Sequence, residues 1–397
     1  MTWPDAPIHT KAHDLRIAMG RHPVLCPHPY YSGGMRVPHP FSRRSFLARA
    51  AATGAGIAAA GALPSAAAHA ARAGSGKTLT LLCWEGYADP SFVKPFERLH
   101  NCTVKATYAG SSDEMVAKWI ASRGNTYDLV SASGDATRRF IKSGTLLPLD
   151  IAKLKNFDQL FPKFHTPAWN TVGGVHYGVS FTWGPDVLIY DTRVFKQAPT
   201  SWKVLYDPKY KGRLSTADNP ITIADVALYL GIADCYNLNA GQLAKIKSTL
   251  LAQKPLLRKY WGGAGDLEDA FKHGEVVASN AWPLMTNDLR KANYPVGETI
   301  PREGATGWAD TWMIAKSSPN VDLGMLWIDY MIGAQGQQGV IDVTNYSGAS
   351  RSAVGQLGAA RVKSLHMDDL AFFDRLHMWT EPANFGEWVK VWNDVKG

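Results

Sequence analysis

The fold class is decided by three short runs, TLTLLCW at residues 78–84, TVKATY at 103–108 and YDLVSA at 127–132. Each run is rich in β-branched and other apolar residues, as half-buried or buried strands are. Helical patterns follow the runs, and the first of them, at 90–100, carries its apolar residues at helical spacing. This alternation of strands and helices predicts a parallel sheet with helices on its faces, which is the α/β class.

Three loops follow the carboxyl ends of these strands, at 84–87, 110–113 and 133–135. Ligands of open α/β sheets bind in the crevice beyond the carboxyl ends of the strands. Polar and aromatic side chains in these loops are therefore candidates for a binding site.

Some residues of these loops have a second interpretation as parts of helices. Ser111 followed by Glu114 has the pattern of a capping box, and Ser133 precedes the next helix, so both serines are favoured as helix caps. Asp135 fits the first turn of that helix and a contact to a cation equally well.

A glycine-punctuated stretch near the other end of the chain, GATGWADTWM at 304–313, combines an aromatic ring with an acid. Trp308 and Asp310 are two residues apart, so on an extended backbone their side chains point the same way. A π-face beside a carboxylate can form half of a cage for an organic cation. The alternative is that Trp308 belongs to the core and Asp310 only opens the next element.

Residues 1–73 have the features of an export leader. SRRSFL at 42–47 has the arginine pair of a twin-arginine signal, and a short run of Ala and Gly at 48–62 follows it. Small residues offer cleavage points after 68–70 or 71–73, so we expect export to the periplasm by the twin-arginine machinery. Met19 and Met35 remain open as alternative starts of the chain.

The net charge of +8 comes mostly from this leader. Residues 1–73 contain eight of the 42 Lys and Arg and two of the 34 Asp and Glu, which leaves 34 basic and 32 acidic residues in 74–397. A nearly neutral mature chain gives no support for nucleic-acid binding, which requires a basic face.

The mature chain is longer than one hydrophobic core usually organises, so we expect two lobes. We also expect the protein to be a monomer. Extended structure is interrupted near 181–185, and 304–313 is the expected return crossing. The predicted boundaries place 74–184 and about 310–345 in the first lobe and 185–309 in the second. The segment 346–397 is expected to be helical from 367 to 396, with its lobe left open.

Further candidates lie in the second lobe and in the C-terminal segment. Asp218 is either a helix cap or a ligand contact, and Trp282 follows a predicted strand. In the C-terminal segment, Trp379, Trp388 and Trp392 are interpreted as packing residues.

The cysteines point to no metal site or disulfide framework. Cys26 lies in the leader, and Cys83, Cys102 and Cys235 form an odd set without close spacing. A Cys83–Cys102 bridge is left open. No metal and no cofactor is expected.

Taken together, the motifs resemble a known family, the extracellular solute-binding proteins of bacterial ABC importers, and within it the spermidine/putrescine-binding type. The resemblance covers nearly the whole mature chain. It rests on these motifs: WEGY at 84–87, GSSDEM at 110–115, YDLVSASGD at 127–135, WGP at 183–185, YKG at 210–212, SNAW at 279–282 and GWAD at 307–310.

The resemblance implies a two-lobed clamshell, joined by two hinge crossings, with the ligand between the lobes. It implies a polyamine or related organic cation as ligand, ABC permease and ATPase subunits as partners, and no catalysis. By matching position, Trp308 and Asp310 resemble the central amine site, and Asp218 a second acidic contact. The ligand-binding candidates are Trp84, Glu85, Tyr87, Ser112, Asp135, Trp183, Asp218, Trp261, Trp282, Trp308, Asp310 and Tyr346.

The chain departs from the family pattern at two points. Ile221 stands where the family has an acid three residues after Asp218, and Gly134-Asp135 stands near a family tyrosine. Asp135 could supply the missing charge, and the exact polyamine stays open.

Two alternatives compete with this interpretation. An exported hydrolase would need an activated nucleophile, but Ser133 lies in SASG rather than in a Gly-x-Ser-x-Gly elbow. A clamshell for ferric ion would need paired tyrosines, and the adjacent pair Tyr30-Tyr31 lies in the leader.

Overall fold

The computed structural model describes residues 77–397. The predicted twin-arginine leader, residues 1–73, lies outside the described residues. None of the helices in the described part of the chain has the length and apolarity that a membrane crossing requires.

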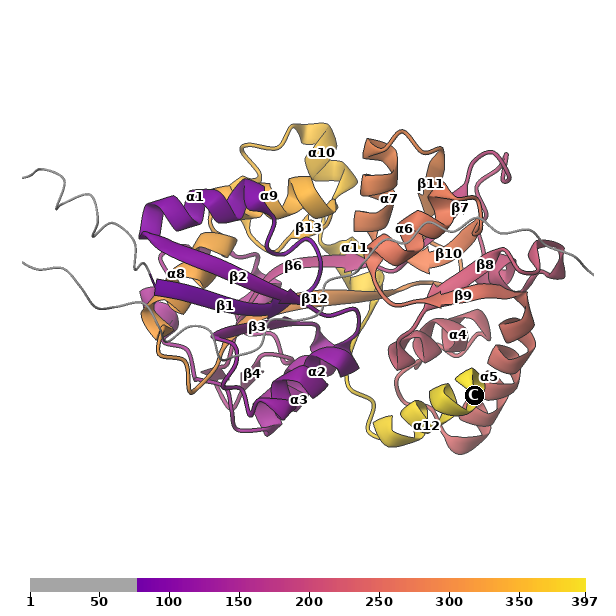
Figure 1. The fold of residues 1–397 in the computed structure, drawn as a ribbon, viewed down its shortest axis with the longest axis horizontal. Helices are drawn as coiled ribbons and strands as arrows, with labels where there is room; N and C mark the ends of the chain where they lie inside the picture. The colour runs from indigo at the N-terminus through magenta and orange to yellow at the C-terminus, as the bar shows by residue number, and fades with distance from the viewer. Residues whose placement is uncertain (1–76) are drawn as a thin grey trace, which may run out of the picture. The chain divides into compact units, whose positions relative to one another are not determined.

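Lobe 1 is built on a mixed sheet with the strand order β13-β6-β12-β3-β1-β2, and β14 pairs with β12 (Figure 1). Its strands are β1 Lys77–Cys83, β2 Cys102–Tyr108, β3 Leu129–Ala132, β6 Val179–Pro185, β12 Thr306–Ile314, β13 Ser347–Gly348 and β14 His377–Met378. β1 is parallel to β2 and β3, whereas β12 is antiparallel to β3 and β6. All nine residues of β12 are buried, which fits a strand with neighbours on both edges.

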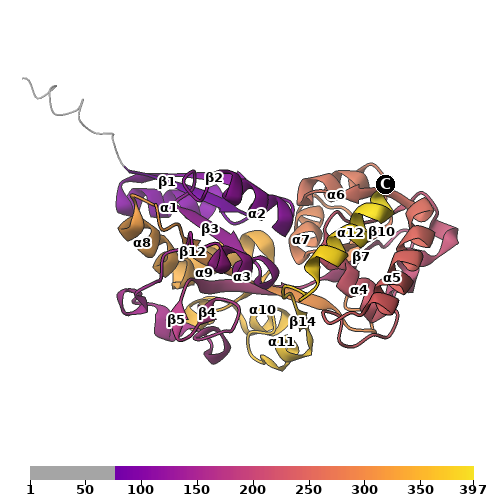
Figure 2. The ribbon, with the colours of Figure 1, turned by 90° about the horizontal axis from the view of Figure 1, so that it is seen from below.

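Helices cover both faces of this sheet. On one side are α1 Pro90–His100, α8 Val321–Ile332 and α9 Ala334–Thr344, and on the other are α2 Ser112–Ala121 and α3 Gly134–Lys142. Helix α1 begins where the sequence dictates, because the Asp89 side chain accepts the Ser91 N–H and Pro90 occupies the first turn. Smaller elements complete lobe 1: β4 Thr171–Val172, β5 Val175–His176, α10 Ala359–Ser364 and α11 Ala371–Arg375 (Figure 2).

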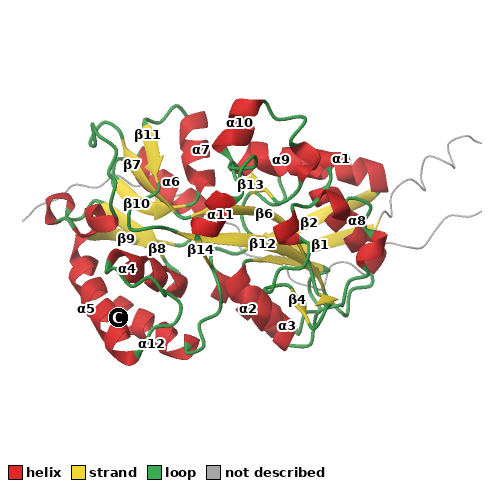
Figure 3. Ribbon diagram, turned by 180° about the vertical axis from the view of Figure 1, so that it is seen from behind, coloured by secondary structure: helices red, strands yellow, loops and turns green. Residues whose placement is uncertain are grey.

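Lobe 2 is built on a second mixed sheet with the order β11-β7-β10-β8-β9. Its strands are β7 Val187–Asp191, β8 Leu214–Ala217, β9 Leu257–Trp261, β10 Ala278–Ala281 and β11 Val296–Thr299. Helices α6 Ala264–Lys272 and α7 Pro283–Lys291 pack together on one side, and α4 Ile223–Tyr229, α5 Ala240–Gln253 and α12 Phe385–Lys396 pack on the other (Figure 3).

The chain crosses between the lobes at three places. It passes from β6 to β7 through Asp186, returns between β11 and β12, and leaves β14 to reach α12. The first two crossings are joined, because the Asp186 N–H donates to the Thr306 carbonyl over 2.8 Å. The Thr306 hydroxyl lies 2.6 Å from Asp186 Oδ2 and 2.7 Å from Asp225 Oδ1 on α4.

The α/β class and the two-lobed architecture are confirmed. The expectation of continuous helix over 367–396 is wrong, because this segment contains α11, the short strand β14 and α12. The backbone at 377–378 pairs with β12 as a strand and so cannot make helical hydrogen bonds. Pro382 lacks the N–H that a helix interior needs.

The Cys83–Cys102 bridge, which the sequence left open, is absent, and both thiols are free. The register of the parallel pair explains this, since Cys83 lies opposite Tyr108 and Cys102 lies opposite Lys77. The two cysteines therefore stand at opposite ends of neighbouring strands, beyond the reach of a disulfide.

Candidate functional site

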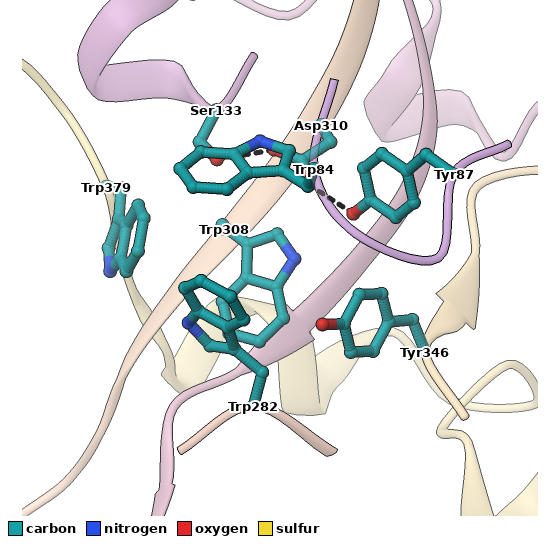
Figure 4. A pocket seen from close by; sticks show the side chains of 8 residues that line it. All are labelled: Trp84, Tyr87, Ser133, Trp282, Trp308, Asp310, Tyr346 and Trp379. Atoms are coloured by element: carbon teal, nitrogen blue, oxygen red, sulfur yellow. Dashed lines mark hydrogen bonds between the residues drawn. The ribbon is translucent and has the colours of Figure 1, made fainter. Parts of the chain in front are cut away.

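Between the lobes lies a pocket that is lined mainly by aromatic rings (Figure 4). Its eight lining residues are Trp84, Tyr87, Ser133, Trp282, Trp308, Asp310, Tyr346 and Trp379. Trp282 comes from lobe 2, and the other residues come from lobe 1.

Strand ends deliver most of these side chains to the pocket. Trp84 follows β1, Ser133 follows β3 and Trp282 follows β10, each at the carboxyl end of its strand. Trp308 and Asp310 both line the pocket from β12, as their two-residue spacing predicts.

Asp310 is the carboxylate of this pocket, and two hydroxyl groups hold it in place. Tyr87 Oη donates to Asp310 Oδ2, and Ser133 Oγ donates to Asp310 Oδ1 (Figure 4). Burial raises the pKa of Asp310 to about 7, although the bonds from Ser133 and Tyr87 lower it, and the charge of Asp135 raises it further. A cation that entered the pocket would favour the ionised form.

The walls of the pocket are rings that meet mostly edge to face. Trp308 lies 5.2 Å from Tyr346, 5.9 Å from Trp379 and 6.3 Å from Trp282, measured between ring centroids. Trp84 lies 5.5 Å from Trp282 across the gap between the lobes. These spacings are those of favourable aromatic pairs, so the rings hold one another in a fixed box.

Two other predicted site residues, Trp261 and Glu85, do not line the pocket. One packs against a lining residue, and the other joins the two lobes. Trp261 packs edge-on against Trp282 at 5.0 Å and donates its indole N–H to Ser279 Oγ over 3.1 Å, so it supports the wall from behind. Glu85 of lobe 1 accepts the N–H of Ala264, at the N-terminus of α6 in lobe 2, over 2.9 Å. This carboxylate therefore joins the two lobes at a helix N-terminus, where negative charge is stabilising.

A second interlobe contact lies beside Glu85. A Cβ atom added to Gly110 would stand 1.7 Å from the carbonyl oxygen of Gly262, whereas one added to Gly262 would meet no atom within 4 Å. The loop before α2 and the loop after β9 thus touch through glycine backbone.

Asp218 and Trp183 lie outside the pocket. Both oxygens of Asp218 accept from Lys396 of α12, at 2.6 and 2.5 Å, and Trp392 donates to it as well. Trp183 is fully buried in β6, donates to the Gly348 carbonyl over 3.1 Å and packs against Phe373. The structure therefore gives Asp218 an ion pair and Trp183 a place in the core.

Ser112 and Asp135 are not among the residues that line the pocket. Ser112 is the first residue of α2, and Asp135 lies in the first turn of α3. Burial raises the pKa of Asp135 to about 6, while the Ser112 hydroxyl and Arg139 lower it. Its negative charge reaches the pocket through its effect on Asp310.

The sequence interpretation missed two lining residues. Ser133 occupies the N-cap position of α3, as predicted, but its side chain makes no cap bond, and its hydroxyl donates to Asp310 instead. Ser111 does cap α2, as predicted, by accepting the Glu114 N–H. The sequence favours Trp379 as a packing residue, yet its side chain lines the pocket. Its backbone N–H donates to the Gly307 carbonyl of β12 over 2.7 Å and holds it beside that strand.

The chemistry of the pocket suits binding. No histidine lines it in the described part of the chain, so Ser133 has no base of the kind that a serine nucleophile requires. Within residues 77–397, no group of three or more His, Cys, Asp or Glu side chains could hold a metal ion. A buried carboxylate among π-faces can instead hold an organic cation.

A family model for bacterial extracellular solute-binding proteins matches residues 91–364 of this chain. A putrescine/cadaverine-binding protein of Pseudomonas aeruginosa is 27% identical over 284 residues, which cover 67% of this chain and 77% of that protein. A spermidine/putrescine-binding periplasmic protein of Escherichia coli is 24% identical over 329 residues, which cover 82% of this chain and 89% of that protein.

Among solved structures, a putative spermidine/putrescine ABC transporter protein from Listeria monocytogenes has a similar fold. The superposition has a TM-score of 0.72 at 21% identity and covers 81% of this chain and 99% of the other. The matched family consists of solute-binding proteins rather than enzymes, which weighs against the hydrolase alternative.

Proposed function

Because this chain belongs to the bacterial extracellular solute-binding proteins, we propose that it captures a polyamine or a related small organic cation between its lobes. It then delivers this cargo to the permease of an ABC importer, which the ATPase subunits drive. In this proposal the protein works as a monomer in the periplasm, after export through the twin-arginine machinery.

The observation that carries the proposal is the environment of Asp310. Its two oxygens accept hydrogen bonds from Tyr87 and Ser133, and tryptophan rings enclose the space in front of it. Hydroxyl donors on both oxygens orient the carboxylate and stabilise its negative charge. A cation over an indole ring gains about 0.5–2 kcal/mol, depending on how far it is desolvated, so several rings and one carboxylate can give useful affinity.

Two further observations support capture between lobes. Glu85 and Gly110 of lobe 1 contact the start of α6 and the loop before it in lobe 2, and the crossings near Asp186 and Thr306 are suited to act as a hinge. The names of the relatives from P. aeruginosa and E. coli, which are similar over most of their length, also favour an amine as cargo.

The proposal is tested by following intrinsic tryptophan fluorescence while putrescine, spermidine, spermine and simple monoamines are added to the full chain. We expect a saturable change with at least one amine, because four tryptophans line the pocket. Sugars, amino acids and ferric citrate serve as controls and should give no change.

The matched variant for this test is Asp310→Asn, which keeps the shape of the side chain and removes its charge. We expect its affinity for the amine to fall by at least 100-fold, because a buried ammonium without a counter-charge is very costly. If no amine binds the folded protein, or if the variant binds as tightly as wild type, the proposed function is wrong.

A further inference from the structure

The pocket has fewer acidic side chains than a site for several cations would need. Among the eight side chains that line it in the described part of the chain, Asp310 is the only carboxylate, and none is Lys, Arg or His. Four of the eight are tryptophans, whose indole groups donate a hydrogen bond and accept none. A ligand with one ammonium group finds a counter-charge here, whereas a second ammonium group finds no second carboxylate among the rings and the Tyr346 hydroxyl.

The other acids among the candidates do not add a second carboxylate to the pocket. Glu85 accepts the N–H at the N-terminus of α6. Asp218 lies outside the pocket, and both of its oxygens accept from Lys396. Asp135 does not line the pocket, and its charge acts on Asp310, whose pKa it raises.

The arrangement of the lining agrees with a cargo that is charged at one end, because the pocket has one carboxylate and several rings. In the view of Figure 4, Trp282 lies at the end of the pocket away from Asp310, and Trp379 forms a side wall near Ser133. The far end of the ligand therefore lies away from any second carboxylate, where burying an uncharged group costs less than burying an ammonium group.

We propose that the cargo is a compact organic monocation, with one ammonium group at Asp310 and an uncharged body between the tryptophans. This inference rests on the proposed function, and it narrows the cargo from organic cations in general to those with a single charge. Diamines and longer polyamines are then poor ligands, because their second ammonium group loses its hydration without gaining a carboxylate.

The test compares ligands that differ only in the second charge. Calorimetric titration of the full chain would measure n-butylamine against putrescine and n-pentylamine against cadaverine, with 1-butanol as the neutral control. We expect each monoamine to bind at least ten-fold more tightly than its diamine, and 1-butanol to bind far more weakly than n-butylamine.

A diamine that binds more tightly than its monoamine would overturn the inference and would leave the proposed function standing. If putrescine or cadaverine binds as tightly as its monoamine, the pocket accommodates two cations and the inference is wrong, although amine capture stands. If no monoamine and no polyamine binds, the proposed function fails together with the inference.

A pair of variants tests the missing acid directly. Trp379→Glu adds a second carboxylate to the lining of the pocket, and Trp379→Gln provides a side chain of the same size as Glu without charge. We expect putrescine to bind the Glu variant at least ten-fold more tightly than the Gln variant. Equal affinities in the two folded variants would show that a second acid is not what diamine binding lacks, and would overturn the inference.

Discussion

At the scale of single residues, the ionisation of Asp310 decides when the pocket can hold a cation. Burial raises the pKa of this carboxyl group to about 7, and only the ionised form attracts an ammonium group. We therefore expect affinity to be constant above pH 8 and to fall about ten-fold per pH unit well below pH 7. Titration calorimetry from pH 5.5 to 8.5 with the tightest-binding amine would measure this.

Tyr87 offers a second prediction, because its hydroxyl lowers the pKa of Asp310. Tyr87→Phe should move the midpoint of the affinity profile to higher pH and weaken binding at pH 7 by about 10- to 100-fold, since hydrogen bonds to charged groups contribute about 1.5–3 kcal/mol. The matched control is Tyr346→Phe, whose ring lines the same pocket. An equal shift of the midpoint in both variants would contradict this role for Tyr87.

Some of these residues could be predicted from sequence and others could not. Trp308 and Asp310 were found because strand geometry sends residues i and i+2 to the same side. Whether the Ser133 hydroxyl caps α3 or bonds to a pocket residue depends on which acceptor lies near it. That acceptor is Asp310, which is 177 residues away in the sequence. The ion pair of Asp218 could not be predicted for the same reason, since its counter-ion Lys396 comes from a distant helix.

At the scale of elements, the two loops that touch through Gly110 and Gly262 allow a steric test of closure. Gly110→Ala would put a methyl group 1.7 Å from the Gly262 carbonyl oxygen, so the lobes could not approach as they do here. We expect its affinity to fall by more than ten-fold with little change in melting temperature. Gly262→Ala has room for its methyl group and should bind as wild type does, and equal affinities would contradict the closing role of the contact.

The hinge contains a pair of acids that must share a proton. The single hydrogen of the Thr306 hydroxyl can be donated to Asp186 or to Asp225 but not to both, although both lie within hydrogen-bond distance. One carboxyl group therefore carries a proton and donates it to the threonine. Burial raises the pKa of Asp225 to about 6, and burial with the charge of Asp225 raises that of Asp186 well above its usual range.

This pair makes stability depend on pH in a definite direction. Because both pKa values are raised, the folded state binds more protons than the unfolded state above about pH 4, so stability falls as pH rises through pH 6 and beyond. The slope is at most about 1.4 kcal/mol per pH unit for one proton. The other groups that act on the pair are the neutral Trp379 and Asn280.

Asp186→Asn mimics the protonated acid and should flatten this dependence. We expect its melting temperature to change less than that of wild type between pH 5 and pH 8, as measured by calorimetry. Asp158→Asn makes the same change at an exposed carboxylate and should leave the wild-type slope intact. An unaltered slope in Asp186→Asn would mean that the hinge acids do not hold the proton.

The elements themselves were largely predictable where the pattern is regular. The first strands and helices of lobe 1 follow from their periodicity, since each buries one apolar face locally. The strand β14 was missed because it has two residues, His377 and Met378, and only its pairing with β12 makes it extended. Short edge strands of this kind carry too few residues to show a period.

At the scale of the whole molecule, the third crossing ties α12 to lobe 2. Trp388 is fully buried there and stacks on Tyr236 at 6.2 Å between ring centroids. Trp388→Ala should lower the free energy of unfolding by about 3–5 kcal/mol, whereas Glu387→Ala, at an exposed neighbour, should change it by less than about 0.5 kcal/mol. Denaturant unfolding would compare them, and similar midpoints would contradict the structural role of α12.

The same crossing has a consequence for the order of events during biosynthesis. Lobe 2 includes α12, at Phe385–Lys396, and lobe 1 includes β14, at His377–Met378. Neither lobe can bury its full core while the ribosome is still translating the strands of the other, although domains commonly fold one after another from the N-terminus. Both halves of this protein therefore mature together and late, after nearly the whole polypeptide has been synthesised.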